Sequence, residues 1–161
     1  MTILRSADYV VMPWQNGLGE TREIIREPLT GEFAWRLSMA TVGERAGFSI
    51  FAGVTRVLAV VEGEALSLTV DDVTTVLRRG GASRRFSGEA PAAAEALGAA
   101  VTDLNLMTRD GLIGSIEPLS AGRVVPDGEV TLIVDLVTLD THVITEPVDW
   151  AGDGYLVRVT R

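Results

Sequence analysis

Short apolar runs interrupted by glycine and other turn residues are the feature of this sequence that most constrains its fold. The chain has 161 residues, of which 17 are glycine and 6 are proline. Turn signals recur about every ten residues, a spacing typical of an all-β sandwich or barrel. The segments that we expect to form strands are residues 36–40, 56–63, 65–71, 73–77, 130–139 and 155–160.

Two segments allow more than one interpretation. Residues 90–100 are rich in alanine, so they could form a short helix, or a strand whose surroundings override helical propensity. Residues 21–27 could begin a helix, but we favour a strand because Ile24 and Ile25 are β-branched. No linker, low-complexity tract or charge block divides the chain, so we expect residues 1–161 to form a single domain.

The absence of lysine and cysteine, together with a single histidine, excludes many kinds of catalytic and metal site. All 14 basic residues are arginine, the chain has no cysteine, and His142 is its only histidine. This composition excludes Schiff-base and P-loop lysines, thiol nucleophiles, disulfides, iron–sulfur clusters and multi-histidine metal sites. We therefore expect no metal and no cofactor, and we interpret His142 as a surface or structural residue.

Charge and hydropathy also limit the partners. The formal net charge of −8 makes nucleic-acid binding electrostatically weak. No apolar run approaches the ~20 residues of a membrane helix. The first residues lack the apolar core of a signal peptide. We expect a cytoplasmic protein with neither a nucleic-acid nor a membrane partner.

Residues 12–24 form the first segment with more polar variety than packing requires. Its candidate ligand-binding residues are Trp14, Asn16, Gly17, Thr21 and Arg22. Gly17 and Gly19 would let the backbone turn sharply and approach a ligand closely. The alternative is a loop that enters a strand, with Trp14 filling the core.

Residues 33–40 form the second such segment. In a strand, alternate side chains point to opposite faces, so Arg36 and Ser38 share a face opposite Leu37 and Met39. An arginine inside a barrel needs an anion, because an unpaired buried charge is costly. The alternative is that Arg36 points to water or pairs with a carboxylate of the protein itself.

Residues 101–109 form the third segment. Asp103 and Asn105 share one face, opposite Leu104 and Leu106. Their spacing could orient a polar ligand. It could also offer oxygen ligands to a metal, although two are too few. The alternative is that both side chains make structural hydrogen bonds.

Several blocks, taken together and in order, resemble the HutD/Ves family. They are residues 12–24 (MPWQNGLGETREI), 33–42 (FAWRLSMATV), 47–64 (GFSIFAGVTRVLAVVEGE), 86–89 (FSGE) and 103–107 (DLNLM). The family usually has Trp-Lys-Asn-Gly-Gly-Gly in the first block, where this chain has Gln15 for the lysine and Leu18 for a glycine. Residues 112–161 carry no matching signature.

The resemblance implies a cupin-type β-barrel built from two fused cupin-like halves. It also implies an association with histidine utilisation and a binding or regulatory role rather than an enzymatic one. The ligands it suggests are pathway intermediates such as formiminoglutamate or N-formylglutamate.

The leading hypothesis is a non-catalytic, metal-free binder of a small anionic metabolite. Arg22, Arg36 and Arg56 would grip carboxylates, because a guanidinium group can bind a carboxylate through two hydrogen bonds. One alternative is a metal-independent isomerase or hydrolase that uses Glu23, Glu62 and Asp103. Another is a protein-interaction module without a small ligand. Strand edges also leave assembly into a homodimer open.

Overall fold

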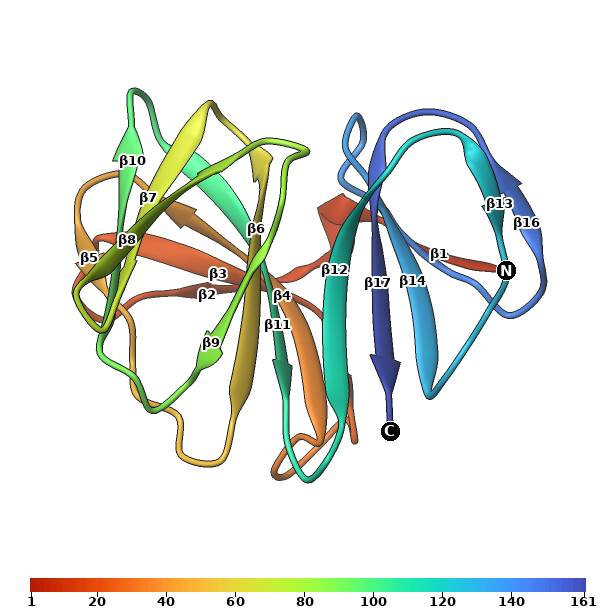
Figure 1. The fold of residues 1–161 in the computed structure, drawn as a ribbon, viewed down its shortest axis with the longest axis horizontal. Helices are drawn as coiled ribbons and strands as arrows, with labels where there is room; N and C mark the ends of the chain where they lie inside the picture. The colour runs from red at the N-terminus through yellow and green to blue at the C-terminus, as the bar shows by residue number, and fades with distance from the viewer.

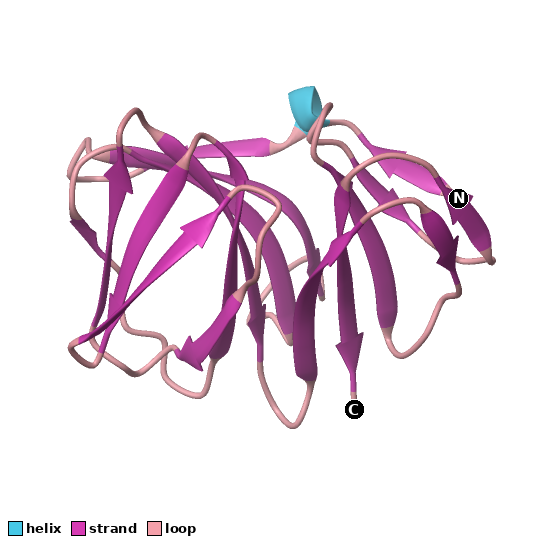
Figure 2. Cartoon of the chain, turned by 45° about the horizontal axis from the view of Figure 1, so that its top comes forward, coloured by secondary structure: helices cyan, strands magenta, loops and turns pink.

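Strands account for nearly all of the regular structure in the computed structural model, which describes residues 1–161 (Figure 1). Figure 2 shows one short 3-10 helix, η1 (Ser6–Asp8), which is too short to cross a membrane. The strands are β1 (Thr2–Leu4), β2 (Val10–Pro13), β3 (Gly19–Glu27), β4 (Trp35–Val42), β5 (Ala46–Gly47), β6 (Thr55–Glu62), β7 (Ala65–Val70), β8 (Val73–Arg78), β9 (Arg84–Ser87), β10 (Ala92–Leu97), β11 (Val101–Thr108), β12 (Ile113–Leu119), β13 (Gly122–Val124), β14 (Val130–Asp135), β15 (Thr141–Val143), β16 (Val148–Trp150) and β17 (Gly154–Thr160).

These strands form two lobes (Figure 1). In the first lobe, a six-stranded sheet in the order β2-β3-β4-β11-β6-β9 faces a four-stranded sheet in the order β5-β10-β7-β8. In the second lobe, a five-stranded sheet in the order β1-β15-β14-β17-β12 lies beside the β13-β16 pair. Strand β1 therefore joins the second lobe although it begins the chain.

The six-stranded sheet is the middle layer of the molecule, because both of its faces are buried. Leu37 and Leu106 on one face belong to an apolar cluster that also contains Leu132 of the five-stranded sheet. Leu58 on the other face packs in a second cluster with Leu68 of the four-stranded sheet. Within β6, Val57 belongs to the first cluster and its neighbour Leu58 to the second, so alternating residues of one strand contribute to two different cores.

The expected strands are present, with one correction to their length. The run 130–139 forms a strand only as far as Asp135, because the Asp135 Oδ1 atom accepts hydrogen bonds from the backbone N–H groups of Val137 and Thr138. The turn residue Leu139 follows, with a positive φ of 62°. A side chain that caps its own backbone ended the strand earlier than its apolar pattern indicated.

Both ambiguous segments form strands. The favoured strand over 21–27 is β3, and the alanine-rich segment contains β10. Strand β10 pairs with β5 on one side and β7 on the other. Ala94 is fully buried against the second cluster. These two ladders outweigh the helical propensity of alanine.

Candidate functional site

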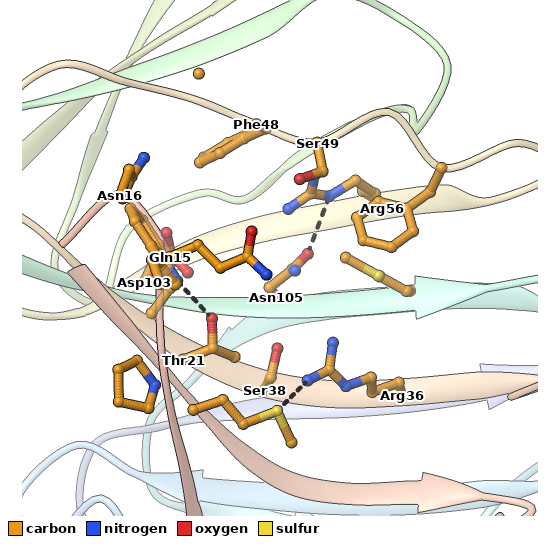
Figure 3. A pocket seen from close by; sticks show the side chains of 17 residues that line it. Gln15, Asn16, Thr21, Arg36, Ser38, Phe48, Ser49, Arg56, Asp103 and Asn105 are labelled. Carbon is orange, nitrogen blue, oxygen red and sulfur yellow. Dashed lines mark hydrogen bonds between the residues drawn. The ribbon is translucent and has the colours of Figure 1, made fainter. Parts of the chain in front are cut away.

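A cavity of about 580 Å³ opens on the four-stranded-sheet side of the six-stranded sheet (Figure 3). Its floor comes from β3, β4, β6 and β11, and its rim comes from β2, from the turn that follows β2, and from the segment after β5. The lining residues are Met12, Pro13, Trp14, Gln15, Asn16, Thr21, Arg36, Ser38, Ala40, Gly47, Phe48, Ser49, Phe51, Arg56, Asp103, Asn105 and Met107.

The strand register arranges the floor in rows. Met107 of β11 lies between Arg36 of β4 and Arg56 of β6. Asn105 pairs with Ser38 in the next row. Asp103 pairs with Ala40 in the row beyond. The predicted division of faces is confirmed, since the intervening leucines of β4 and β11 point into the first cluster.

Arg56 is a buried cation without a carboxylate partner. Arg56 is only 5% exposed, and its guanidinium group forms no ion pair. The Arg56 Cζ atom lies 4.7 Å from the centroid of the Phe48 ring, and Phe51 and Phe86 lie within 6 Å. The Arg56 Nε–H donates to Asn105 Oδ1 at 3.4 Å.

The electrostatic state of Arg56 follows from this packing. Burial lowers its pKa to about 10, Asp103 opposes that change, and the nearby charge of Arg36 adds to it. The guanidinium group therefore stays protonated at neutral pH. The three aromatic rings stabilise it through cation–π contacts, which are stronger where water is excluded.

Asp103 is a buried acid at another place on the same floor. The residue is 1% exposed, and neither carboxylate oxygen has a hydrogen-bond partner of ordinary geometry. Burial raises its pKa to about 7, while the charge of Arg56 and the backbone N–H of Ala40 oppose the rise. The carboxyl group therefore changes its protonation state near neutral pH.

Arg36 already has a partner within the protein, as one of the two alternatives predicted. Its Nε–H donates to Glu23 Oε1 at 3.3 Å, and its Nη2 atom lies 3.8 Å from Met12 Sδ. The side chain nevertheless lines the cavity, and Nη1 makes no hydrogen bond within the protein. Arg36 can therefore contact both Glu23 and a ligand.

The rim after β2 combines packing with polar contacts. Trp14 packs against the second cluster, and its Nε1–H donates to Thr21 Oγ1 at 2.9 Å. A Cβ atom on Gly19 would lie 2.5 Å from the Thr41 carbonyl oxygen and 2.9 Å from the Trp14 ring. Glycine at position 19 is thus required by the approach of both β4 and Trp14. Trp14 packs against the second cluster and also lines the cavity, while its contact with a ligand stays a prediction.

The structure brings eight of the ten predicted binding residues to this cavity. They are Trp14, Asn16, Thr21, Arg36, Ser38, Arg56, Asp103 and Asn105. Gly17 lies in the turn at a φ of 73° and does not line the cavity. Arg22 follows Thr21 on a strand and so points to the opposite face, where its Nη2 atom is 3.8 Å from Met39 Sδ. Arg22 therefore cannot grip a ligand in the cavity.

The segment between β5 and β6 supplies lining residues that the sequence analysis did not single out. Phe48, Ser49 and Phe51 close the cavity over Arg56. Gln15 of the rim was missed as well. The sequence signal that could have identified these lining residues is the pair Phe48 and Phe51, which lies between two glycines in a stretch without the alternation of a strand.

The other candidate chemistry is dispersed. Glu62 accepts a hydrogen bond from Thr102 Oγ1 at 3.2 Å and does not line the cavity. Glu23 is engaged by Arg36. His142 lies in the second lobe, with its ring centroid 4.9 Å from that of Trp150. The cavity contains one carboxylate and no histidine, so its residues do not fit a metal ion.

Comparisons with known proteins place this geometry in a family. The family model described as HutD matches residues 6–121. An uncharacterized 21.2 kDa protein in the hutC 3′ region of Pseudomonas putida is 40% identical over 109 residues, covering 66% of this chain and 57% of that protein. The chain spans about half the length of the curated relatives it matches.

Solved structures agree with the fold. The structure of HutD from Pseudomonas fluorescens SBW25 matches with a TM-score of 0.87 and 28% identity, covering 99% of this chain and 97% of that one. A cupin domain of a transcriptional regulator from Enterobacter cloacae matches with a TM-score of 0.50 and 16% identity, covering 58% of this chain and 98% of that one. The fold is therefore of the cupin type, while the division into two cupin-like halves and the single domain over 1–161 stay predictions.

The sequence match covers the strands that form the cavity floor, and the structural match covers these strands and nearly all of the rest of the chain. The matched residues amount to well over half of the chain. This chain belongs to the HutD family.

Proposed function

We propose that the protein is a non-catalytic, metal-free binder of a small anionic metabolite and that it regulates histidine degradation. The observation that carries the proposal is Arg56, a buried and protonated guanidinium group that faces the cavity without a carboxylate partner. A buried charge is costly unless it is paired. A ligand carboxylate would supply the missing partner.

The size and lining of the cavity support the same proposal. Its volume of about 580 Å³ lies within the usual range for small-molecule sites. Arg36 and Arg56 flank Met107, so a single carboxylate could contact both guanidinium groups. Charge-assisted hydrogen bonds are worth about 1.5–3 kcal/mol each. A carboxylate that makes two such bonds to each guanidinium group would gain about 6–12 kcal/mol, a range that includes the roughly 8 kcal/mol of micromolar binding.

Family membership supplies the link to histidine degradation. The Pseudomonas putida relative is named for its place in the hutC 3′ region, and the closely superimposed structure is a HutD. Formiminoglutamate and N-formylglutamate, intermediates of that pathway, carry the carboxylates that the two arginines require. They are the ligands we propose.

Binding can be tested by thermal unfolding and calorimetry with both intermediates. A ligand at 100 times its Kd stabilises the folded state by about 2.7 kcal/mol, which raises the Tm by roughly 5 °C or more. We expect Arg36→Ala to remove most of this shift. Arg123→Ala is the matched control, because Arg123 is an exposed residue of the second lobe that pairs with Asp149. Absence of binding heat with both intermediates would refute the proposal.

One observation favours a second function. The pKa of Asp103 near 7 suits a general acid or base, and the residue lines the cavity. A metal-independent isomerase or hydrolase would then use Asp103 alone, since Glu23 and Glu62 are engaged elsewhere. Turnover of a pathway intermediate by the purified protein, lost in Asp103→Asn, would establish this function instead.

A further inference from the structure

Asp103 is the cavity residue whose surroundings anion binding alone leaves unexplained. Both of its carboxylate oxygens are buried without a hydrogen-bond partner of ordinary geometry, and the backbone N–H of Ala40 is the one donor near them, so the folded protein has removed an acid from water without fully replacing its hydrogen bonds. Such a loss is costly for a polar group and more so for a charged one. The residue is nevertheless among those that line the cavity, so its unpartnered oxygens lie at the cavity wall.

The cavity has two unlike ends. Asp103 precedes Met107 by four residues on β11, a separation of roughly 13 Å along an extended strand. Figure 3 shows Arg36 and Arg56 at one end of the cavity and Asp103, with Gln15 and Asn16, at the other. The positive groups and the acid are thus presented to different parts of a bound molecule.

The charge balance of the lining points to the kind of ligand. Its ionisable residues are Arg36, Arg56 and Asp103, and Glu23 already balances Arg36. One unpaired cation and one unpaired acid remain. A ligand that carries only carboxylates would satisfy the cation and add negative charge beside Asp103. A ligand with a carboxylate at one end and an N–H group at the other would satisfy both.

We propose that the cavity selects ligands with two unlike ends, a carboxylate held by Arg36 and Arg56 and an ammonium, amidinium or amide N–H group received by Asp103. This inference rests on the proposed function, because it assigns the two ends of the molecule bound there. Asp103 is the specificity-determining residue. It attracts nitrogen donors and repels a carboxylate end that has no N–H group beside it. Both proposed intermediates carry an N–H group next to one of their carboxylates, whereas a plain dicarboxylate does not.

Three five-carbon probes test this selection, because they share one carboxylate and differ only at the far end. They are pentanoate with a methyl end, 5-aminopentanoate with an ammonium end and glutarate with a carboxylate end. By calorimetry at pH 8, where Asp103 is mostly ionised, 5-aminopentanoate should bind about tenfold or more tightly than pentanoate. Glutarate should bind most weakly. The same comparison with four- and six-carbon probes allows for the span of the cavity.

The variant Asp103→Asn keeps the shape of the side chain and removes its charge. We expect it to abolish the preference for the ammonium end and to strengthen glutarate binding. Asp149→Asn is the matched control, because Asp149 lies in the second lobe with a side chain that is 81% exposed. It should leave the order of the three probes unchanged.

Proton exchange gives a test that needs no variant. A nitrogen donor beside Asp103 favours the ionised carboxylate, so binding of 5-aminopentanoate at pH 7 should release protons. Pentanoate adds negative charge and favours the protonated acid, so its binding should take up protons. Calorimetry in two buffers with different ionisation enthalpies measures both quantities.

The outcomes separate this inference from the proposed function. Equal affinities for the three probes in the wild-type protein, or proton uptake with 5-aminopentanoate, would overturn the role of Asp103 while anion binding stands. Failure of every probe, together with both histidine-pathway intermediates, to bind would overturn anion binding and this inference with it.

Discussion

Arginine side chains serve two purposes in this protein. Several donate to backbone carbonyl oxygens of distant segments and so hold loops and strand ends in place. Examples are Arg79 to Leu136, Arg84 to Leu68, Arg109 to Ala52 and Arg158 to Val125. The branched, planar guanidinium group suits such contacts because its donors point in fixed directions. Arg56 differs from these residues because it faces the cavity and reaches only the Asn105 side chain.

At the same scale, Asp103 predicts how stability depends on pH. The pKa of Asp103 is about 7 in the folded protein, against 3.8 for an ordinary aspartate. Between these values the folded state binds more protons than the unfolded state, so the free energy of unfolding falls as pH rises. Above about pH 7 this loss is complete. At 1.36 kcal/mol per pKa unit, the full effect is up to about 4 kcal/mol.

Asp103→Asn removes this titration. In urea unfolding from pH 5 to pH 8, the free energy of unfolding of the variant should therefore rise relative to that of the wild-type protein by roughly 2–3 kcal/mol. Asp149→Asn should run parallel to the wild-type protein, because Asp149 is exposed. Parallel profiles for Asp103→Asn as well would contradict the raised pKa of Asp103.

At the scale of elements, the start of β3 depends on one glycine. A Cβ atom at position 19 meets both the Thr41 carbonyl oxygen of β4 and the Trp14 ring at less than 3 Å. Trp14 lines the cavity and is held by its hydrogen bond to Thr21. The pairing of β3 with β4 and the shape of the rim therefore depend on the same position.

We expect Gly19→Ala to destabilise the protein by about 1–3 kcal/mol, the usual cost of overpacking, and to weaken ligand binding by displacing Trp14. Denaturant unfolding and calorimetry measure the two effects. Gly43→Ala is the control, because a Cβ atom there has nothing within 4 Å. A fully stable Gly19→Ala with normal binding would show that the rim adapts.

Local alternation made much of the site predictable from the sequence. The faces of Arg36, Ser38, Asp103 and Asn105 follow from a period of two, which is a property of any strand. The same rule excludes Arg22, which was assigned by residue type rather than by its position after Thr21. The alternation of side chains along a strand therefore predicted the cavity residues more reliably than residue type did.

Tertiary features account for what was missed. The segment that carries Phe48 and Phe51 reaches the cavity only because β5 pairs with β10. The pKa of Asp103 depends on its burial within the fold and on the charge of Arg56 from a neighbouring strand, neither of which a local pattern encodes. The Ala94 environment likewise comes from two ladders rather than from its own sequence.

At the scale of the whole molecule, the two lobes share one core. The first cluster joins Leu37, Leu104 and Leu106 of the six-stranded sheet to Leu132 and Val157 of the five-stranded sheet. Neither sheet could bury these side chains without the other. We therefore expect the lobes to unfold together in one transition.

Leu132→Ala tests this coupling, because Leu132 is fully buried in the second lobe. It should lower the free energy of unfolding by about 2–5 kcal/mol. Introduced together with Trp150→Phe, it leaves Trp14 and Trp35 of the first lobe as the fluorescent reporters. The unfolding midpoint reported by their fluorescence should fall, relative to the Trp150→Phe protein, by as much as the midpoint measured by circular dichroism. An unchanged midpoint for these tryptophans would show that the first lobe folds independently.

The alternation along β4 and β11 has a consequence for how such proteins diverge. Inserting or deleting one residue within β11 would exchange Asp103 and Asn105 with Leu104 and Leu106, placing leucines in the cavity and polar groups in the shared core. Homologues can thus change their ligand by substitution at alternate positions, or by altering the length of the surrounding turns. We expect homologues that keep this cavity to have no single-residue insertion or deletion within these strands.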